Sequence, residues 1–318
     1  EKGNTDLADW RQKCEENADA LAGCMITYPS THGIFEQDIR AMIEAVHSYG
    51  GYVYMDGANM NAQIGWTNPA FIGADVCHLN LHKSFASPHG GGGPGAGAVC
   101  CTAAMAECLP TEDMNRVSSS LYGNANMALI SWSYIAMMGA EGLRHATAAA
   151  ILSANYMASR LKDAYGIVYT GATGRVGHEL ILDCRQFHTI GITEADIAKR
   201  LMDYGYHAPT LSFPVHGTLM VEPTESESLV EIDRFCDVLL QIRQEIADIE
   251  SGKADKTDNV LLNAPHPEYE VVSDEWAHPY SRREAAYPTE WVAQTKFWCP
   301  VGRVDNGFGD RNLVARFQ

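Results

Sequence analysis

The first eighty residues alternate between short apolar runs and segments whose apolar side chains recur every three or four positions. Three apolar runs predict strands, at 24–28, 52–55 and 76–81. Two segments carry the helical period, at 6–22 and 34–49, and the second ends at Gly50-Gly51. Strands that alternate with helices predict a parallel α/β sheet covered by helices on both faces.

The second half of the chain follows a different pattern. A long Ala- and Met-rich helical segment is predicted over 127–165, followed by a strand at 179–184. A capping box at Thr193–Asp196 opens a helix that closes at Gly205. A strand at 218–221 and a helix at 225–251 complete a small α+β domain. From 252 onward the chain is Pro-rich and predicted to be ordered coil.

Polar side chains follow the predicted strands of the first half. Residues 29–32 (PSTH) come after the first strand, Asp56 ends the second, and Lys83 ends the third. Ligands of open α/β sheets bind at the carboxyl ends of the strands. These positions are therefore the first candidates for a functional site.

Composition narrows the class of function. The formal net charge of −17 repels phosphate backbones, so the sequence predicts no nucleic-acid partner. No stretch approaches the roughly 20 apolar residues that span a bilayer, so no membrane partner is expected. The nine cysteines are scattered, which indicates a reducing compartment. The chain does not begin with methionine, and we expect a processed chain or a fragment.

The stretch HLNLHKSFASPHGGGGPG (78–95) allows three kinds of chemistry. A metal site would use His78, His82 and His89. The first two fall on a predicted strand roughly 13 Å apart, too far to share one zinc ion, so no metal is predicted. The glycine-rich run lacks the lysine and Ser/Thr of a nucleotide P-loop. It either lets backbone amides approach a phosphate or simply turns the chain.

The third possibility is a reactive lysine. A lysine at the end of a buried strand is unusual, and desolvation there favours the neutral amine that Schiff-base chemistry needs. Pyridoxal 5′-phosphate (PLP) also requires an acid to keep its ring nitrogen protonated. Asp56 supplies that acid, although Asp-Gly is equally a turn signal. The pairing of Asp56 with Lys83 favours the cofactor.

A family resemblance supports this interpretation. The block 53–97 reads VYMDGANMNAQIGWTNPAFIGADVCHLNLHKSFASPHGGGGPGAG and closely resembles the glycine decarboxylase P proteins of the glycine cleavage system. Further similar blocks are ITYPSTHGIFE (26–36), MMGAEGLRHAT (137–147), RLMDYGYHAPTLSFPVHGTLMVEPTESES (200–228) and PVGRVDNGFGDRNL (300–313). Ser84 departs from the family's usual Thr, which removes no group that the chemistry needs.

The resemblance implies a PLP-dependent aminotransferase-like fold (fold type I) with a large α/β domain and a small α+β C-terminal domain. The expected division is 1–126 for the PLP-binding part of the large domain, 127–165 for a connecting helical segment, 166–252 for the small domain and 253–318 for a coil-rich extension. The family places its first strands and main phosphate-binding turn well before the lysine. The large domain is thus expected to be N-terminally incomplete, and the chain to be a C-terminal, catalytic portion.

The resemblance also implies roles for individual residues. Lys83 is expected to bind PLP covalently and Asp56 to pair with its ring nitrogen. Six further residues are expected around the cofactor: Ala58, Asn59, His82, Ser84 and the turn residues Thr31 and His32. Arg185 and Arg303, with Arg311 as a further option, are candidates for holding the glycine carboxylate.

The implied activity is PLP-dependent decarboxylation of glycine, with transfer of the aminomethyl group to the lipoyl arm of the H protein and release of CO2. The expected partners are glycine, the lipoylated H protein, and either a second copy or the remaining P-protein portion. The expected compartment is the mitochondrial matrix in a eukaryote and the cytoplasm otherwise. Two alternatives stay open: another fold type I enzyme, such as an amino-acid decarboxylase or a hydroxymethyltransferase-like protein, or a non-catalytic fragment that only scaffolds a partner.

Overall fold

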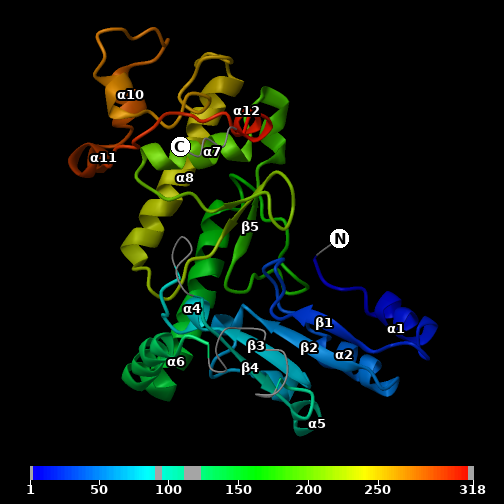
Figure 1. Cartoon of the computed structure of the whole chain (residues 1–318). Coiled ribbons are helices and arrows are strands. Elements are labelled where there is room, and N and C mark those ends of the chain that lie inside the picture. The colour runs from blue at the N-terminus through cyan, green and yellow to red at the C-terminus, as the bar shows by residue number, and fades with distance from the viewer. Residues whose placement is uncertain (1–2, 90–94, 111–122, 314–318) are drawn as a thin grey trace. The chain divides into compact units, whose positions relative to one another are not determined.

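The computed structural model describes residues 3–89, 95–110 and 123–313 (Figure 1). Its contacts form two compact units that interleave along the chain. Unit 1 comprises Glu1–Ala158, Val168–Leu180 and Glu222–Ser228, and unit 2 comprises Ser159–Ile167, Ile181–Val221 and Leu229–Gln318. The four-part domain division expected for the family stays a proposal.

Unit 1 is built on a four-stranded sheet (Figure 1). Its strands are β1 (Gly23–Thr27), β2 (Tyr52–Gly57), β3 (Val76–Asn80) and β4 (Gly97–Cys101), in the order β1-β2-β3-β4. The three predicted strands are confirmed and pair in parallel, whereas β4 is antiparallel to β3. The sequence did not indicate β4, because the segment GAVCC is short and follows a glycine-rich run.

Helices cover one face of this sheet. They are α1 (Leu7–Glu16), α2 (Ile39–Ser48) and α3 (Pro69–Ile72). Ile43 and Val46 of α2 pack with Val53 and Met55 of β2 in the core of the unit. On the opposite face Met25 is 65% exposed, so the prediction of two covered faces is wrong for the described residues. α2 connects β1 to β2, and α3 connects β2 to β3, so both connections lead to the next strand on the same side. Right-handed crossovers that proceed in one direction along a sheet place their helices on the same face.

The helix boundaries differ from the prediction for local reasons. The Asp6 side chain accepts hydrogen bonds from the first turn of α1 and starts that helix as predicted. It ends early, at Glu16, where the Asn17 side chain bonds back to the Lys13 carbonyl. α2 begins at Ile39 rather than at 34, because residues 30–34 are already engaged in a tight turn closed by a Ser30–Ile34 bridge.

The segments after β2 and β3 are short helices, η1 (Met60–Ala62) and α4 (Leu81–Ser84), followed later by α5 (Ala103–Ala106). The predicted long helical segment is α6 (Ala125–Leu161). It is interrupted at Gly139, whose φ of 61° lies in the left-handed region that glycine adopts readily. None of the helices in the described ranges is long and apolar enough to cross a membrane.

Unit 2 contains a three-stranded sheet in the order β5-β7-β6. Its elements are β5 (Leu180–Asp183), η2 (Arg185–Ile190), α7 (Glu194–Asp203), β6 (Thr210–Leu211), β7 (Thr218–Val221) and α8 (Leu229–Glu250). The predicted capping box at Thr193 and Asp196 is confirmed. The segment predicted as coil also contains four short helices, α9 (Glu268–Val271), α10 (Arg282–Ala286), α11 (Glu290–Thr295) and α12 (Asn306–Arg311).

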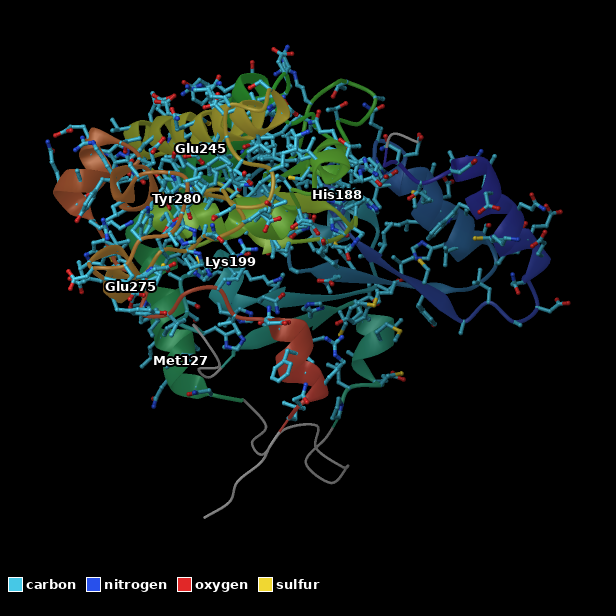
Figure 2. All side chains as sticks on the ribbon, turned by 90° about the horizontal axis from the view of Figure 1, so that it is seen from above. Met127, His188, Lys199, Glu245, Glu275 and Tyr280 are labelled. Carbon is cyan, nitrogen blue, oxygen red and sulfur yellow. The ribbon has the colours of Figure 1, made fainter. Side chains whose placement is uncertain are left out.

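A buried set of charged groups, here called the Arg200 network, lies in unit 2 and comprises Arg200, Asp203, Glu245 and His266. The Arg200 guanidinium is fully buried and donates to Glu245 and Asp203, at 2.8 and 2.9 Å. The Asp203 carboxylate also accepts from His266, whose other ring nitrogen lies 3.0 Å from the Tyr280 hydroxyl. Figure 2 labels Glu245 and Tyr280 among the side chains of this unit.

Candidate active site at the carboxyl edge of the unit 1 sheet

Three segments with chemically useful side chains follow the parallel strands of unit 1. The 29–32 turn comes two residues after β1, Asp56 is the penultimate residue of β2, and Lys83 lies in α4 directly after β3 (Figure 1). Strand register places Thr27 beside Asp56, and Asp56 beside His78. The prediction that these groups gather at strand ends is confirmed.

The Asp56 carboxylate is held by two neighbours. The Ala58 backbone N–H donates to Oδ1 at 2.8 Å, and His78 Nε2 lies 3.2 Å from the same oxygen. The other His78 nitrogen, Nδ1, is 2.8 Å from the Tyr54 hydroxyl. Burial, with the Asp56 charge adding to it, raises the pKa of Tyr54, so its O–H stays available to donate to Nδ1. A His78 ring that accepts this hydrogen bond at Nδ1 has its N–H on Nε2, the nitrogen that lies beside Asp56.

His78 is a site residue whose role the sequence did not reveal. Sequence reasoning considered it only as a metal ligand, because a strand pairing that brings it beside Asp56 is not visible in the spacing. The sequence did show that His78 lies in the predicted strand that follows the strand ending at Asp56.

Lys83 is exposed, so the prediction of a desolvated lysine buried in the sheet is wrong for this chain. β3 ends at Asn80, and the helical turn of α4 carries Lys83 away from the sheet interior. The next residue, Ser84, is buried, and its hydroxyl has no hydrogen-bond partner in the described part of the chain. A buried unpaired hydroxyl costs free energy unless something fills its site.

Two side chains from the segment after β2 hold the turn that follows β1. Asn59 is buried and its amide donates to the Pro29 carbonyl at 2.9 Å. Gln63, which the sequence did not single out, is fully buried and donates to the Tyr28 carbonyl. Thr31 and His32 are half-buried in this turn. Asn59 and Gln63 thus position the turn through these two hydrogen bonds, and the expected contact of Asn59 with the cofactor stays a proposal.

The three histidines of the 78–95 stretch do not converge. His82 lies in α4, not on the strand as predicted, because the strand stops at Asn80. Its ring lies 4.4 Å from that of His89, centroid to centroid, whereas His78 contacts Asp56 and Tyr54. Residues 90–94 of the glycine run lie outside the described residues.

The two arginines predicted to bind a carboxylate lie in unit 2. Arg185 donates to the Asp183 carboxylate at 2.9 and 2.6 Å. Arg303 donates to Asp196 and to the backbone carbonyls of Leu261 and Ala264. Each guanidinium therefore has partners within its own unit, and a role toward the substrate stays a proposal.

A second group of polar side chains in unit 1, here called the His178 cluster, comprises His178, Glu179 and Glu222. One ligating atom of each lies within 4.8 Å of the other two. His178 and Glu179 are 1% and 4% exposed. Burial raises the pKa of Glu179 to about 8, with Glu222 raising and Lys83 lowering it. Burial, aided by Lys83, lowers the pKa of His178. The field of Lys83 therefore reaches this cluster.

Sequence reasoning missed the His178 cluster. It placed Glu179 at the start of a strand and Glu222 after another, but gave neither a function. The signal was a His-Glu pair directly before the apolar run LIL (180–182), since charged residues rarely enter a buried strand without a partner.

Comparison with known proteins places this geometry in a family. A family model described as "Glycine dehydrogenase, C-terminal domain" matches residues 146–266. The glycine dehydrogenase (decarboxylating) of Bacteroides thetaiotaomicron is 62% identical over 320 residues, covering 99% of this chain and 34% of that protein. The chain is similar along nearly its whole length to a portion of the glycine dehydrogenases (decarboxylating).

Relatives of this chain occur in bacteria and in a eukaryote. The mitochondrial glycine dehydrogenase (decarboxylating) of Dictyostelium discoideum is 53% identical and covers 98% of this chain. The chain spans about a third of the length of these relatives, 34% and 33% respectively. The resemblance to glycine decarboxylase P proteins is thereby confirmed.

Solved structures confirm the fold class of the chain. A glycine decarboxylase (P-protein) in inhibitor-bound form matches with a TM-score of 0.56 and 18% identity, over 69% of this chain and 54% of that one. A cysteine desulfurase from Thermococcus onnurineus matches with a TM-score of 0.61 and 14% identity, over 76% of this chain and 64% of that one. The α/β fold is that of the fold type I PLP-dependent enzymes.

The residues present fit PLP. Asp56 is an oriented carboxylate of the kind that a protonated ring nitrogen requires, and Lys83 offers an accessible amine on the adjoining strand end. The buried Ser84 hydroxyl beside that lysine has no hydrogen-bond partner in the described ranges, which suits a group that binds there.

Proposed function

We propose that this chain binds PLP through Lys83 and that the whole protein uses it to decarboxylate glycine, passing the aminomethyl group to the lipoyl arm of the H protein and releasing CO2. The observation that carries the proposal is the placement of Asp56 and Lys83 after adjacent parallel strands. The identity of 62% with a glycine dehydrogenase (decarboxylating) supports the choice of substrate.

When bound, PLP supplies an electron sink for the bond that breaks at the amino acid's Cα. The protein's task at the ring nitrogen is to hold a proton there. Asp56 accepts a hydrogen bond from the Ala58 amide and lies 3.2 Å from His78 Nε2, and these two neighbours orient its carboxylate toward a ring nitrogen bound beside it. Tyr54 maintains this arrangement by fixing the tautomer of His78.

Other residues have supporting roles in this proposal. Ala58 packs on the cofactor, and Asn59, Thr31 and His32 shape the adjoining turn. His82 and Ser84 flank the lysine and orient the cofactor. Arg185 or Arg303 holds the substrate carboxylate. A second copy or the remainder of the P protein completes the site, and the compartment is mitochondrial in a eukaryote and cytoplasmic in a bacterium.

A two-step experiment tests this function. PLP is first added to the purified protein, and the absorbance band of lysine-bound PLP is expected in the wild type and absent in Lys83→Ala. The Asp56→Ala variant is expected to bind PLP at least tenfold more weakly, because the protonated ring nitrogen loses its counter-charge. If no PLP concentration gives the band, the chain is a scaffold and the proposal is wrong.

The second step distinguishes the glycine cleavage reaction from other fold type I chemistry. Exchange of the glycine carboxyl carbon with bicarbonate is measured with and without lipoylated H protein, using the complete protein. Exchange that requires the H protein supports the proposal. Release of methylamine without the H protein would instead assign the chain to an ordinary amino-acid decarboxylase.

A further inference from the structure

The His178 cluster lies where several segments of unit 1 meet. Gly33 of the turn after β1 lies so close to Glu179 that an added Cβ would be 2.7 Å from the Glu179 carbonyl oxygen and 3.5 Å from its Cγ. Asn61, at the centre of η1, donates to the Glu222 carboxylate at 3.1 Å. η1 lies beside α4, which carries Lys83. The cluster therefore adjoins the edge of the sheet at which the active site is proposed.

The cluster has more polar atoms than partners. Neither ring nitrogen of His178 makes a hydrogen bond within the described residues, and Oε1 of Glu179 also has no partner there. His178 Nε2 lies 3.6 Å from Glu222 and 4.0 Å from Glu179, too far for direct hydrogen bonds. Buried polar atoms of this kind are rare, because each unpaired one costs roughly 1–3 kcal/mol. The arrangement indicates a missing group that donates several hydrogen bonds.

The spacing between these atoms can be compared with the spacing of ligands around a metal ion and of acceptors around an ammonium. Ligands about 2.1 Å from a tetrahedral zinc ion are about 3.4 Å apart. Acceptors about 2.9 Å from a tetrahedral ammonium nitrogen are about 4.7 Å apart. His178 Nε2 lies 3.6 Å from Glu222 and 4.0 Å from Glu179, so both separations fall between these two values. An –NH₃⁺ group has three N–H donors, one for each of the three acceptors.

We propose that His178, Glu179 and Glu222 form a receptor for a primary ammonium group at the active site. Glu222 is the open side of the receptor, because its side chain is 43% exposed whereas the other two are buried. Two sources of the ammonium share this chemistry: the Lys83 amine, once a substrate amine has replaced it on the cofactor, and the amine of an external molecule. The first source rests on the proposed function, whereas the second does not.

Charge supports the same ligand. Burial holds His178 neutral near pH 7, so its ring accepts a hydrogen bond rather than adding a competing positive charge. Glu179 keeps a proton up to about pH 8 in the absence of a cation, and an arriving ammonium releases that proton by stabilising the carboxylate. The charged groups that face Glu179 are Glu222, His178 and Lys83. Ammonium binding is therefore expected to tighten as the pH rises toward about 8.

Reactivity of Lys83 tests the internal source. The purified protein without PLP is treated with trace acetic anhydride at pH 9, and acetylation of Lys83 is quantified by mass spectrometry. An amine that is hydrogen-bonded in the receptor reacts more slowly than a free one, so loss of one receptor carboxylate is expected to accelerate the reaction about 5- to 10-fold in Glu179→Gln and in Glu222→Gln. Both changes keep the side-chain shape. The matched control is Glu227→Gln, an exposed carboxylate of the same unit, with an expected rate equal to wild type.

Calorimetry tests the external source. Methylammonium chloride is titrated into wild type and into Lys83→Ala, with sodium chloride as the blank. Binding to Lys83→Ala alone assigns the receptor to the lysine amine, and binding to both proteins assigns it to an external amine. In either case, adding Glu179→Gln to the protein that binds methylammonium is expected to abolish the heat of binding.

Two results would overturn the proposal. One is an unchanged Lys83 acetylation rate in both glutamine variants together with no methylammonium binding to either protein. The other is stoichiometric binding of zinc or manganese, lost in Glu179→Gln, in place of methylammonium. A normal PLP band in the same preparations would show that the proposed cofactor binding survives the failure of this receptor.

Discussion

The two units each bury a cluster of charged side chains, and the clusters differ in how they are paired. In the Arg200 network the guanidinium has carboxylate and carbonyl partners, and Asp203 is bonded to both Arg200 and His266. In the His178 cluster both ring nitrogens and one carboxylate oxygen lack hydrogen bonds within the described part of the chain. Similar residue types thus serve two purposes: the paired cluster holds structure together, and the unpaired one awaits a ligand.

The pKa values record the same contrast. Burial alone would raise the pKa of Asp203, but hydrogen bonds from His266 and the Arg200 charge hold it below its usual value. For Glu179 only the charge of Lys83 opposes this effect, and burial raises its pKa to about 8. A carboxyl group that must stay protonated to remain buried is poorly matched to its surroundings until a cation arrives.

The largest expected effect comes from breaking the paired cluster. Arg200→Ala leaves Asp203 and Glu245 buried without their cation, and is expected to lower the free energy of unfolding by about 3–5 kcal/mol. Urea titration followed by circular dichroism measures this change. Lys253→Ala is the control, since Lys253 pairs with Asp248 at the surface and is 74% exposed, so its loss is expected to cost less than about 1 kcal/mol. Equal losses in both variants would contradict the contrast.

The next effect comes from neutralising the unpaired cluster. The pKa of Glu179 is raised from 4.5 to about 8 on folding, so the unfolded chain releases a proton between these pH values that the folded chain retains. The contribution of Glu179 to the free energy of unfolding is fully present below about pH 4.5 and is lost as the pH rises toward 8. The Glu179→Gln variant has no carboxyl group to titrate here, so it is expected to avoid this loss of a few kcal/mol.

Unfolding free energies measured at pH 5 and pH 8, in wild type and Glu179→Gln, check this expectation. The difference between the two proteins is expected to grow with pH in favour of the variant. Glu227→Gln, whose side chain is exposed, is expected to follow the wild-type curve. Parallel curves for Glu179→Gln and wild type would mean that Glu179 is not held protonated in the folded chain.

A smaller effect is expected at the unpaired hydroxyl of Ser84. Ser84→Ala removes a buried polar group without a hydrogen-bond partner in the described chain, and is expected to raise the unfolding free energy by about 1 kcal/mol. The same change is expected to weaken PLP binding, measured by absorbance titration, because the variant lacks the hydroxyl that would form a hydrogen bond with the cofactor. Reduced stability with unchanged PLP affinity would show that the hydroxyl serves the fold alone.

The smallest effect is expected from Tyr54→Phe. The variant removes the hydroxyl that fixes the His78 tautomer, and is expected to weaken PLP binding about 3- to 5-fold, the effect of one modest hydrogen bond. Tyr52→Phe, on the same strand and 48% exposed, is the control and is expected to bind PLP as wild type does. A PLP affinity unaffected by Tyr54→Phe would remove Tyr54 and His78 from the proposed support of Asp56.

Much of the secondary structure was predictable because it depends on local periodicity. The three parallel strands, the capping box at Thr193 and the strand at Thr218–Val221 were all predicted. Antiparallel β4 was not, since its pairing with β3 is a contact between segments that no local pattern reports. The exposure of Lys83 was also mispredicted. The prediction assumed that the strand continues to Lys83, whereas the chain forms one turn of helix after β3 and the Lys83 side chain is exposed there.

The sequence by itself determined which residues carry the proposed chemistry and where each lies relative to its strand. Asp56 and Lys83 follow short apolar runs, and the order of alternating strands and helices places them at one edge of a parallel sheet. These features are local, and so they are visible in spacing and residue type.

Only the tertiary structure decided which side chains meet. His78 lies beside Asp56 because β2 and β3 pair in one particular register. Glu222 joins His178 and Glu179, more than forty positions earlier in the chain, through the packing of unit 1. Pairing register and burial depend on the whole fold, so the difference between a satisfied and an unsatisfied charge cannot be derived from the chain order alone.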